Sequence, residues 1–184
     1  LMITLYEVNA DKKALEKSIK IMNDTWELFF NKETQLFQKN IIKDNDLFAS
    51  PLDLNDSNIP NGNSVYLLIS NKLYSITNDK IWSERNEVLK KSFHQVLNSY
   101  YSQMFSFIKT LDICDNSLSF TFSGTSQSIK EIQLYLQKEY LGVATFVYQL
   151  NNDTKPSVIV CKNQTCSNKL TNINEAVEYL SKSD

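Results

Sequence analysis

The shortage of glycine, proline and histidine limits the chemistry that this chain of 184 residues can support. Its three glycines are scattered, so it has no Gly-rich loop of the kind that cradles nucleotide phosphates. Any Ser-His-Asp or Cys-His catalytic arrangement would have to use His94, because there is no other histidine. Lys90, Lys91 and Asn98 are its neighbours at helical spacing, so we expect His94 at the edge of a polar face and not in an active site.

Strong charge bias and long apolar runs are also missing. The 19 basic and 21 acidic residues give a net charge of −2, which leaves no positive field for nucleic-acid binding. No apolar run approaches the ~20 residues that span a bilayer. The opening residues soon meet Glu7 and Asp11 and do not form a signal peptide. The sequence therefore predicts neither a nucleic-acid partner nor a membrane.

Three cysteines, an odd number, argue against a disulfide scaffold, and we expect a reducing, cytoplasmic setting. Cys161 and Cys166 lie at the end of an expected strand and in the turn after it. Their four-residue gap is not the Cys-x-x-Cys of zinc ribbons or thioredoxin-type sites. Inert thiols and a reversible dithiol pair both stay open. A zinc site would need ligands from elsewhere, so none is predicted, and Cys114 is expected as a buried thiol at a helix-to-strand junction.

Apolar residues that recur every three or four positions predict helices throughout the first 112 residues. We expect helices over 1–9, from a cap at Asp11 to about Phe30, and over 62–77, 80–99 and about 102–112. The segment 32–60 breaks this period and is expected as a long functional loop. Short extended pieces are expected in it at Leu36-Phe37 and Ile41-Ile42. Successive helices with short turns indicate stacked helical hairpins, hence a mainly α fold.

The period changes to two after Cys114. Leu118, Phe120 and Phe122 alternate with Ser and Thr, as in a half-buried strand. The elements expected next are a helix over about 127–141, strands over 143–148 and 157–161, and a helix over 173–182 capped by Asn172. This order predicts a small α/β element, strand-helix-strand-strand-helix, with a parallel crossover. We therefore expect two domains, 1–112 and 113–184.

The densest group of polar side chains precedes the expected helix 62–77. Pro60 keeps Ile59 out of the α region, so the helix begins after it with Asn61 as N-cap. Gly62 permits close approach of a ligand to the first-turn N–H groups and the positive end of the helix dipole. The candidate ligand-binding residues are Asp53, Asp56, Asn61, Gly62, Asn63 and Ser64. Such a cluster suits a polyhydroxylated or anionic ligand, and the alternative is an ordinary capped helix after a surface loop.

Two motifs in a fixed order resemble a known family. Asp56…Pro60-Asn61-Gly62-Asn63-Ser64-Val65 opens a helix; a strand–helix–strand follows, then Val160-Cys161…Cys166 and a closing helix. Over essentially the whole chain this resembles the C-terminal third of the thioredoxin-domain proteins related to spermatogenesis-associated protein 20. The resemblance implies a partial (α/α) toroid, the last hairpins of an (α/α)6 ring like that of six-hairpin glycosidases, followed by a small α/β subdomain. It also implies a thioredoxin-like domain and the earlier hairpins elsewhere in the protein.

From this resemblance we expect the toroid loop to hold a carbohydrate-like or other polyol ligand. Asp56 would accept ligand hydroxyls, and Asn61, Asn63 and Ser64 would donate. No general acid or base is assigned, so the question of catalysis stays open, and no cofactor is expected. Relatives commonly carry Arg where Ser50 stands, and its loss removes a bidentate donor for a charged substrate.

Two other functions stay open. In one, Cys161 and Cys166 exchange with the dithiol of a thioredoxin-like domain. In the other, both motifs serve packing in a non-catalytic scaffold. The expected partners are the thioredoxin-like and toroid parts of the same protein, or a second copy of the chain, because an open ring leaves apolar helix faces uncovered.

Overall fold

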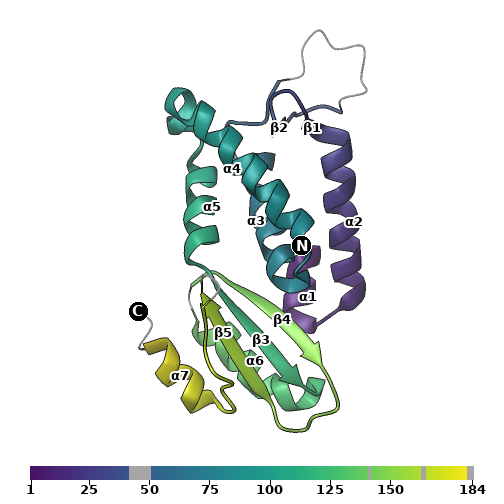
Figure 1. Ribbon diagram of the computed structural model, residues 1–184, viewed down its shortest axis with the longest axis vertical. Coiled ribbons are helices and arrows are strands. Elements are labelled where there is room, and N and C mark those ends of the chain that lie inside the picture. The colour runs from purple at the N-terminus through teal and green to yellow at the C-terminus, as the bar shows by residue number, and fades with distance from the viewer. Residues whose placement is uncertain (42–50, 141, 163–164, 182–184) are drawn as a thin grey trace. The chain divides into compact units, whose positions relative to one another are not determined.

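A computed structural model of the chain describes residues 1–41, 51–140, 142–162 and 165–181, without the side chains of 98–100 (Figure 1). These residues form a helix-rich protein with a small mixed sheet, in two compact units. The first unit comprises Leu1–Tyr6 and Asp11–Cys114, and the second comprises Glu7–Ala10 and Asp115–Asp184. The sequence places the boundary at 112/113; the units divide after Cys114, and four N-terminal residues join the second unit. Within the described ranges, none of the helices has both the length and the apolar content that a membrane crossing requires.

The predicted helices of the first unit are confirmed. They are α1 (Met2–Asn9), α2 (Lys12–Phe29), α3 (Gly62–Thr77), α4 (Lys80–Tyr100) and α5 (Phe105–Asn116), with a 3₁₀ turn at Tyr101–Gln103. Asp11 caps α2, because its carboxylate accepts from the N–H groups of Lys13 and Ala14. The turn between α3 and α4 is made by Asn78, which is left-handed at φ 54° and ends α3 as an αL cap.

Two predictions about this unit need revision or fall outside the described residues. The sequence places Cys114 at a helix-to-strand junction, but α5 continues to Asn116, and Cys114 lies in its last turn and packs on the core. Leu36–Phe37 does form a strand, β2, paired antiparallel with β1 (Phe30–Asn31). Ile42, half of the second extended piece, lies outside the described residues.

Aromatic rings dominate the core of the first unit. Phe93 and Phe107 stack with ring centroids 3.5 Å apart, and both are almost fully buried. Arg85 crosses the same core: its guanidinium lies 4.8 Å from the Trp26 ring centroid and 5.1 Å from that of Trp82. Such cation–π contacts let a charged group sit among apolar side chains.

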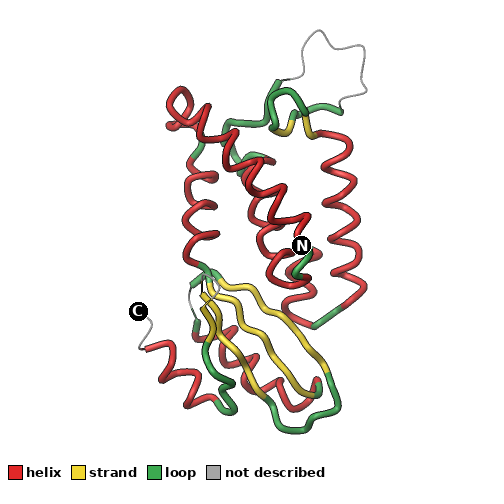
Figure 2. The backbone as a smooth tube through the Cα atoms, in the orientation of Figure 1, coloured by secondary structure: helices red, strands yellow, loops and turns green. Residues whose placement is uncertain are grey.

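The second unit is built on a four-stranded sheet with the order β4-β3-β5-β6 (Figure 2). Its elements are β3 (Leu118–Gly124), α6 (Ser126–Glu139), β4 (Ala144–Leu150), β5 (Ser157–Lys162), β6 (Thr165–Cys166) and α7 (Ile173–Ser181). The pairing of β3 with β4 is parallel, as the crossover predicts, and β5 is antiparallel to β3. The two-residue strand β6 was not predicted, because it is too short to show a period.

The two faces of this sheet differ. Phe120, Phe122, Val158 and Val160 are fully buried and form one core with α6 and α7. The alternate positions of β3 carry Ser119, Thr121 and Ser123 and are only half-buried. The polar and apolar residues of β3 therefore separate onto opposite faces.

Residues Glu7–Ala10, at the end of α1, complete this unit. The backbone carbonyl of Glu7 accepts from Gln137 at 2.9 Å and from the Tyr148 hydroxyl, and the Val8 carbonyl accepts from Gln133 at 2.8 Å. The Glu7 carboxylate accepts from the backbone N–H of Phe146, on the edge strand β4. A free backbone donor of that edge is thereby used.

Candidate functional site

Asp56, one of the candidate ligand residues, holds the loop before α3 together. Its carboxylate accepts from the Asn61 backbone N–H at 3.0 Å, from the Asn61 side-chain amide at 2.9 Å and from the Ser106 N–H at 2.7 Å. The Ser106 hydroxyl donates to it as well. Asp56 thus ties the loop to the first turn of α5, 50 residues further along the chain.

The environment of Asp56 also fixes its charge. Burial raises the pKa of this carboxyl, but the hydrogen bonds from Ser106 and Asn61 outweigh burial and leave the pKa below its ordinary value. The group is therefore ionised at neutral pH, with its lone pairs already engaged. Such a carboxylate is poorly suited to give a proton to a substrate.

Asn61 is the N-cap of α3, as predicted. Its side-chain oxygen accepts from the Ser64 N–H at 2.9 Å and from the Ser64 hydroxyl at 2.8 Å. Both residues are buried, with 2% and 1% of their surface exposed. The Ser106 hydroxyl completes the cluster, 2.9 Å from that of Ser64. Local sequence gives no sign of Ser106, because its partners lie far away along the chain.

Asn63 serves the backbone of its neighbours. Its side-chain oxygen accepts from the Phe37 N–H at 2.9 Å, and its amide donates to the Phe37 carbonyl at 3.3 Å and the Asp53 carbonyl at 2.6 Å. The residue is 0% exposed. Its polar atoms are used to hold β2 and the loop against the start of α3.

Asp53 occupies the anion position at the start of α3. Its carboxylate accepts from the Gly62 N–H, as a bound anion would. A Cβ on Gly62 would lie 2.6 Å from that oxygen, closer than real Cβ contacts come. Glycine therefore allows the close approach that the sequence suggests, but the group that approaches is the Asp53 side chain of the protein itself.

A cavity of about 580 Å³ lies beside this loop, bounded by α2, α3 and the loop itself. Of the six candidate residues, all of which the structure describes, Asp53, Asn61 and Gly62 line the cavity, and the other three do not. Ile21, Val65 and Ile69 supply much of its apolar lining. Lys39 and Asp53 bring one charge of each sign to the same cavity.

Tyr66 also lines the cavity and connects it to the aromatic core. Its hydroxyl accepts from the Arg85 guanidinium at 3.0 Å, and Arg85 donates to Asn23 at 2.8 Å. Burial, opposed by the Arg85 charge and hydrogen bond, raises the pKa of Tyr66 to about 12. Tyr66 is therefore neutral at physiological pH, and Arg85 holds its hydroxyl in place.

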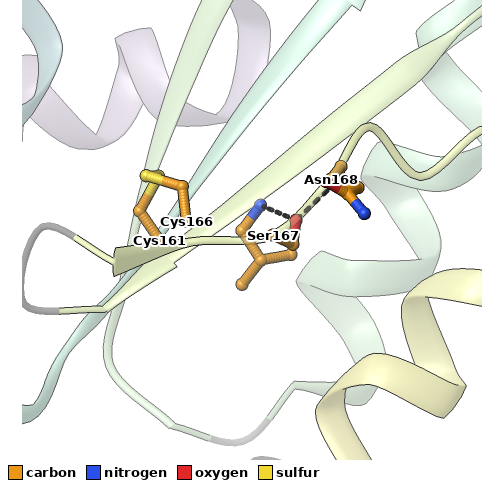
Figure 3. The surroundings of a disulfide bond; sticks show 5 residues. Cys161, Cys166, Ser167 and Asn168 are labelled. Carbon is orange, nitrogen blue, oxygen red and sulfur yellow. Dashed lines mark hydrogen bonds between the residues drawn. A yellow bond between two sulfur atoms is a disulfide. The ribbon is translucent and has the colours of Figure 1, made fainter.

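The two candidate redox residues are joined. Cys161 and Cys166 form a disulfide across the hairpin of β5 and β6 (Figure 3). The third cysteine, Cys114, is in no disulfide and belongs to the first unit; it is half-buried, where the sequence predicts a buried thiol. His94 is exposed on α4. Across the described part of the chain, no group of three or more His, Cys, Asp or Glu residues converges as a metal site.

Comparison with models of known protein families gives no match, and comparison with curated proteins gives none either. The assignment of function therefore depends on the residues and geometry of the chain itself.

Proposed function

We propose that the first unit binds a carbohydrate-like ligand in the cavity bounded by α2, α3 and the loop before α3. The observation that carries this proposal is the cavity itself, about 580 Å³, which Asp53, Asn61 and Gly62 of the candidate loop help to line. This volume falls within the range of small-molecule sites in proteins.

The lining of the cavity restricts the class of ligand that fits. A sugar ring offers hydroxyls at its edge and a face of C–H groups, and the side chains of Ile21, Val65 and Ile69 complement such a face. Lys39 can donate to hydroxyls and Asp53 can accept from them. Since these two charges offset each other, an uncharged polyol with one apolar face fits better than an anion.

The geometry also shifts the roles within the candidate loop. Asp56, Asn63 and Ser64 support the loop through internal hydrogen bonds, so the proposal gives the ligand contact to Asp53, which lines the cavity. The proposal includes no acid–base pair, because glycoside hydrolysis needs two carboxylates at a set distance, and among the described residues Asp53 alone brings a carboxylate to the cavity. Binding without catalysis is the activity proposed.

We further propose that the chain is the C-terminal part of a thioredoxin-domain protein related to spermatogenesis-associated protein 20. In this proposal α2–α5 are the last hairpins of an (α/α)6 toroid, the other hairpins and a thioredoxin-like domain are its partners, and the setting is cytoplasmic. A gene that encodes a thioredoxin-like domain directly upstream would support this assignment. A gene context without one would remove it.

Ligand-detected NMR tests the proposed binding. Octyl and phenyl glucosides should show saturation transfer from the protein, and glucose alone should show less, because it lacks the apolar group. The Ile21→Ser and Val65→Ser variants should each weaken binding roughly fivefold, the effect of losing about 1 kcal/mol of apolar contact. Both side chains are partly exposed, so neither change is expected to unfold the unit.

The matched control is Leu134→Ser, an exposed leucine on α6 in the second unit. It should leave binding unchanged. Absence of saturation transfer with every glycoside, or equal loss in all three variants, would contradict the proposal. The loop would then serve packing alone.

A further inference from the structure

The Cys161–Cys166 disulfide lies where the two strands of the β5–β6 hairpin come close together. The Ser167 N–H donates to the Val160 carbonyl at 2.8 Å, one of the two bonds that define a hydrogen-bonded position, while the Val160 N–H donates to the Ser167 hydroxyl. The next pair, Cys161 and Cys166, is therefore a non-hydrogen-bonded pair, in which side chains on adjacent strands come closest. Their Cα atoms are 4.0 Å apart.

The bond is accessible from outside the core. Cys166 is exposed and Cys161 half-buried, at the edge of the sheet. Cys161 pairs with Ser119, on the polar face of β3, whereas its neighbour Val160 faces the core. The disulfide thus lies outside the apolar core, and Cys166 is its more exposed residue.

Basic residues lie close to the two cysteines along the chain. Residues 154–174 include Lys155, Lys162 and Lys169 and no Asp or Glu. Lys162 directly follows Cys161, and a positive charge next to a thiolate stabilises it as the leaving group when a disulfide is attacked. The same lysines would attract a partner whose surface is acidic.

The hairpin does not depend on the bond for its register. The Val160 N–H donates to the Ser167 hydroxyl at 3.0 Å, and that hydroxyl donates to the Asn168 carbonyl at 2.7 Å (Figure 3). Val158 and Leu170 exchange two further backbone hydrogen bonds, of 2.8 and 2.9 Å. Opening the disulfide leaves these contacts in place, so the two cysteines stay close enough to close again.

The geometry points to the Cys161–Cys166 pair as a reversible thiol–disulfide exchange site, with a protein dithiol as its reductant and Cys166 as the sulfur attacked. A thiolate of the dithiol forms a bond to Cys166 Sγ, the Cys161–Cys166 bond breaks, and Cys161 leaves as a thiolate that takes up a proton. The second thiol of the partner, as thiolate, then attacks the mixed disulfide and releases Cys166 as a thiolate, which also takes up a proton. Two electrons pass from the partner, which becomes a disulfide, to the two cysteines.

A trapping experiment on the full chain tests this assignment. The Cys114→Ser variant, in which only the pair can react, is mixed under native conditions with a thioredoxin-type protein whose second cysteine is replaced by serine. Trypsin cuts after Lys162, so the two cysteines fall on different peptides that mass spectrometry distinguishes. The mixed disulfide should occur on the Cys166 peptide in roughly tenfold excess, because Cys166 is the more exposed of the two residues.

A second measurement tests the role of the lysines. Lys162→Gln combined with Lys169→Gln should slow reduction by the intact dithiol protein roughly twofold at low salt, since exposed charges act weakly. Lys130→Gln on α6 is the control and should change nothing. Trapping mainly on Cys161 would overturn the assignment. So would a pair that is reduced only once urea has unfolded the chain, because the bond would then be a structural staple.

Discussion

The loop before α3 and the β5–β6 hairpin both gather chemically active side chains. Those of the loop are buried in the protein, and the disulfide of the hairpin lies at the surface. In the loop, Asn61, Asn63 and Ser64 are at most 2% exposed, and their polar atoms bond within the protein. In the hairpin, Cys166 is exposed and the disulfide faces away from the core. Polar side chains that hydrogen-bond to one another stabilise the fold. A reactive group at the surface is able to react with a partner protein.

The largest expected effect is on the loop. Asn63→Ala leaves the buried Phe37 N–H and the Asp53 carbonyl without their partner, which should lower the free energy of unfolding by about 3 kcal/mol. Both tryptophans, Trp26 and Trp82, lie in the first unit, so tryptophan fluorescence during urea unfolding reports that unit alone. Asn58→Ala, an exposed asparagine of the same loop, is the control and should change little. Equal losses of stability in the Asn63→Ala and Asn58→Ala variants would contradict the role of Asn63 in stabilising the loop.

The next effect belongs to the hairpin. Replacing Cys161 and Cys166 together by serine removes a short covalent loop, which should lower the stability of the second unit by about 2 kcal/mol. Amide exchange in β5 and α7 should report the loss, and the tryptophan signal of the first unit should not move. A reducing agent should reproduce the result in the natural chain and do nothing to the double variant. A shift in the tryptophan transition would contradict the division into units.

The Asp56→Asn variant tests how the stability of the loop depends on pH. Replacing a carboxylate that accepts from Ser106 and Asn61 should cost about 1.5 kcal/mol at pH 7, measured by the same fluorescence. Because the folded protein holds the pKa of Asp56 below its ordinary value, this stability is present above pH ~4 and is lost as pH falls through the folded pKa. The gap between the two proteins should therefore shrink in acid. A gap that is constant down to pH 2 would contradict this account.

The smallest effect concerns the cavity wall. Tyr66→Phe removes the hydrogen bond from Arg85 and should cost about 1 kcal/mol. The folded state raises the pKa of Tyr66 to about 12, so the natural chain should lose stability as pH rises from about 10 toward 12. The variant should lose less over that range. Difference absorbance of the tyrosinate band between pH 10 and 12 measures the ionisation of Tyr66, and the variant should lack this contribution.

The course of the backbone could be predicted well from the sequence. The apolar stripe of α2, the cap at Asp11 and the alternation in β3 each depend on local rules. The bounds 62–77 for α3 follow from Pro60 and Asn61 at one end and Asn78 at the other. The strand β6 and the end of α5 were missed, because two residues carry no period and Cys114 continues the helix by packing on the core.

The candidate site was less predictable, because its partners are distant in sequence. Local spacing grouped Asp56 with Asn61, but it could not show that Ser106 closes the cluster. It showed that Gly62 accepts a close neighbour, and the structure gives that place to Asp53. The cavity depends on side chains of α2, such as Ile21, whose spacing marks them only as helical. Hydrogen-bond partners that are distant in sequence can be identified only from the three-dimensional structure.

The four residues Glu7–Ala10 have a consequence for how the second unit comes into being. The Glu7 and Val8 carbonyls in this segment bond to Gln133, Gln137 and Tyr148, which lie more than a hundred residues further along the chain. The second unit is therefore complete only after the segment that carries Tyr148 has been made. A shortened gene that starts at Asp115 would yield a sheet whose β4 border lacks its cover, and such a border recruits strands from other molecules.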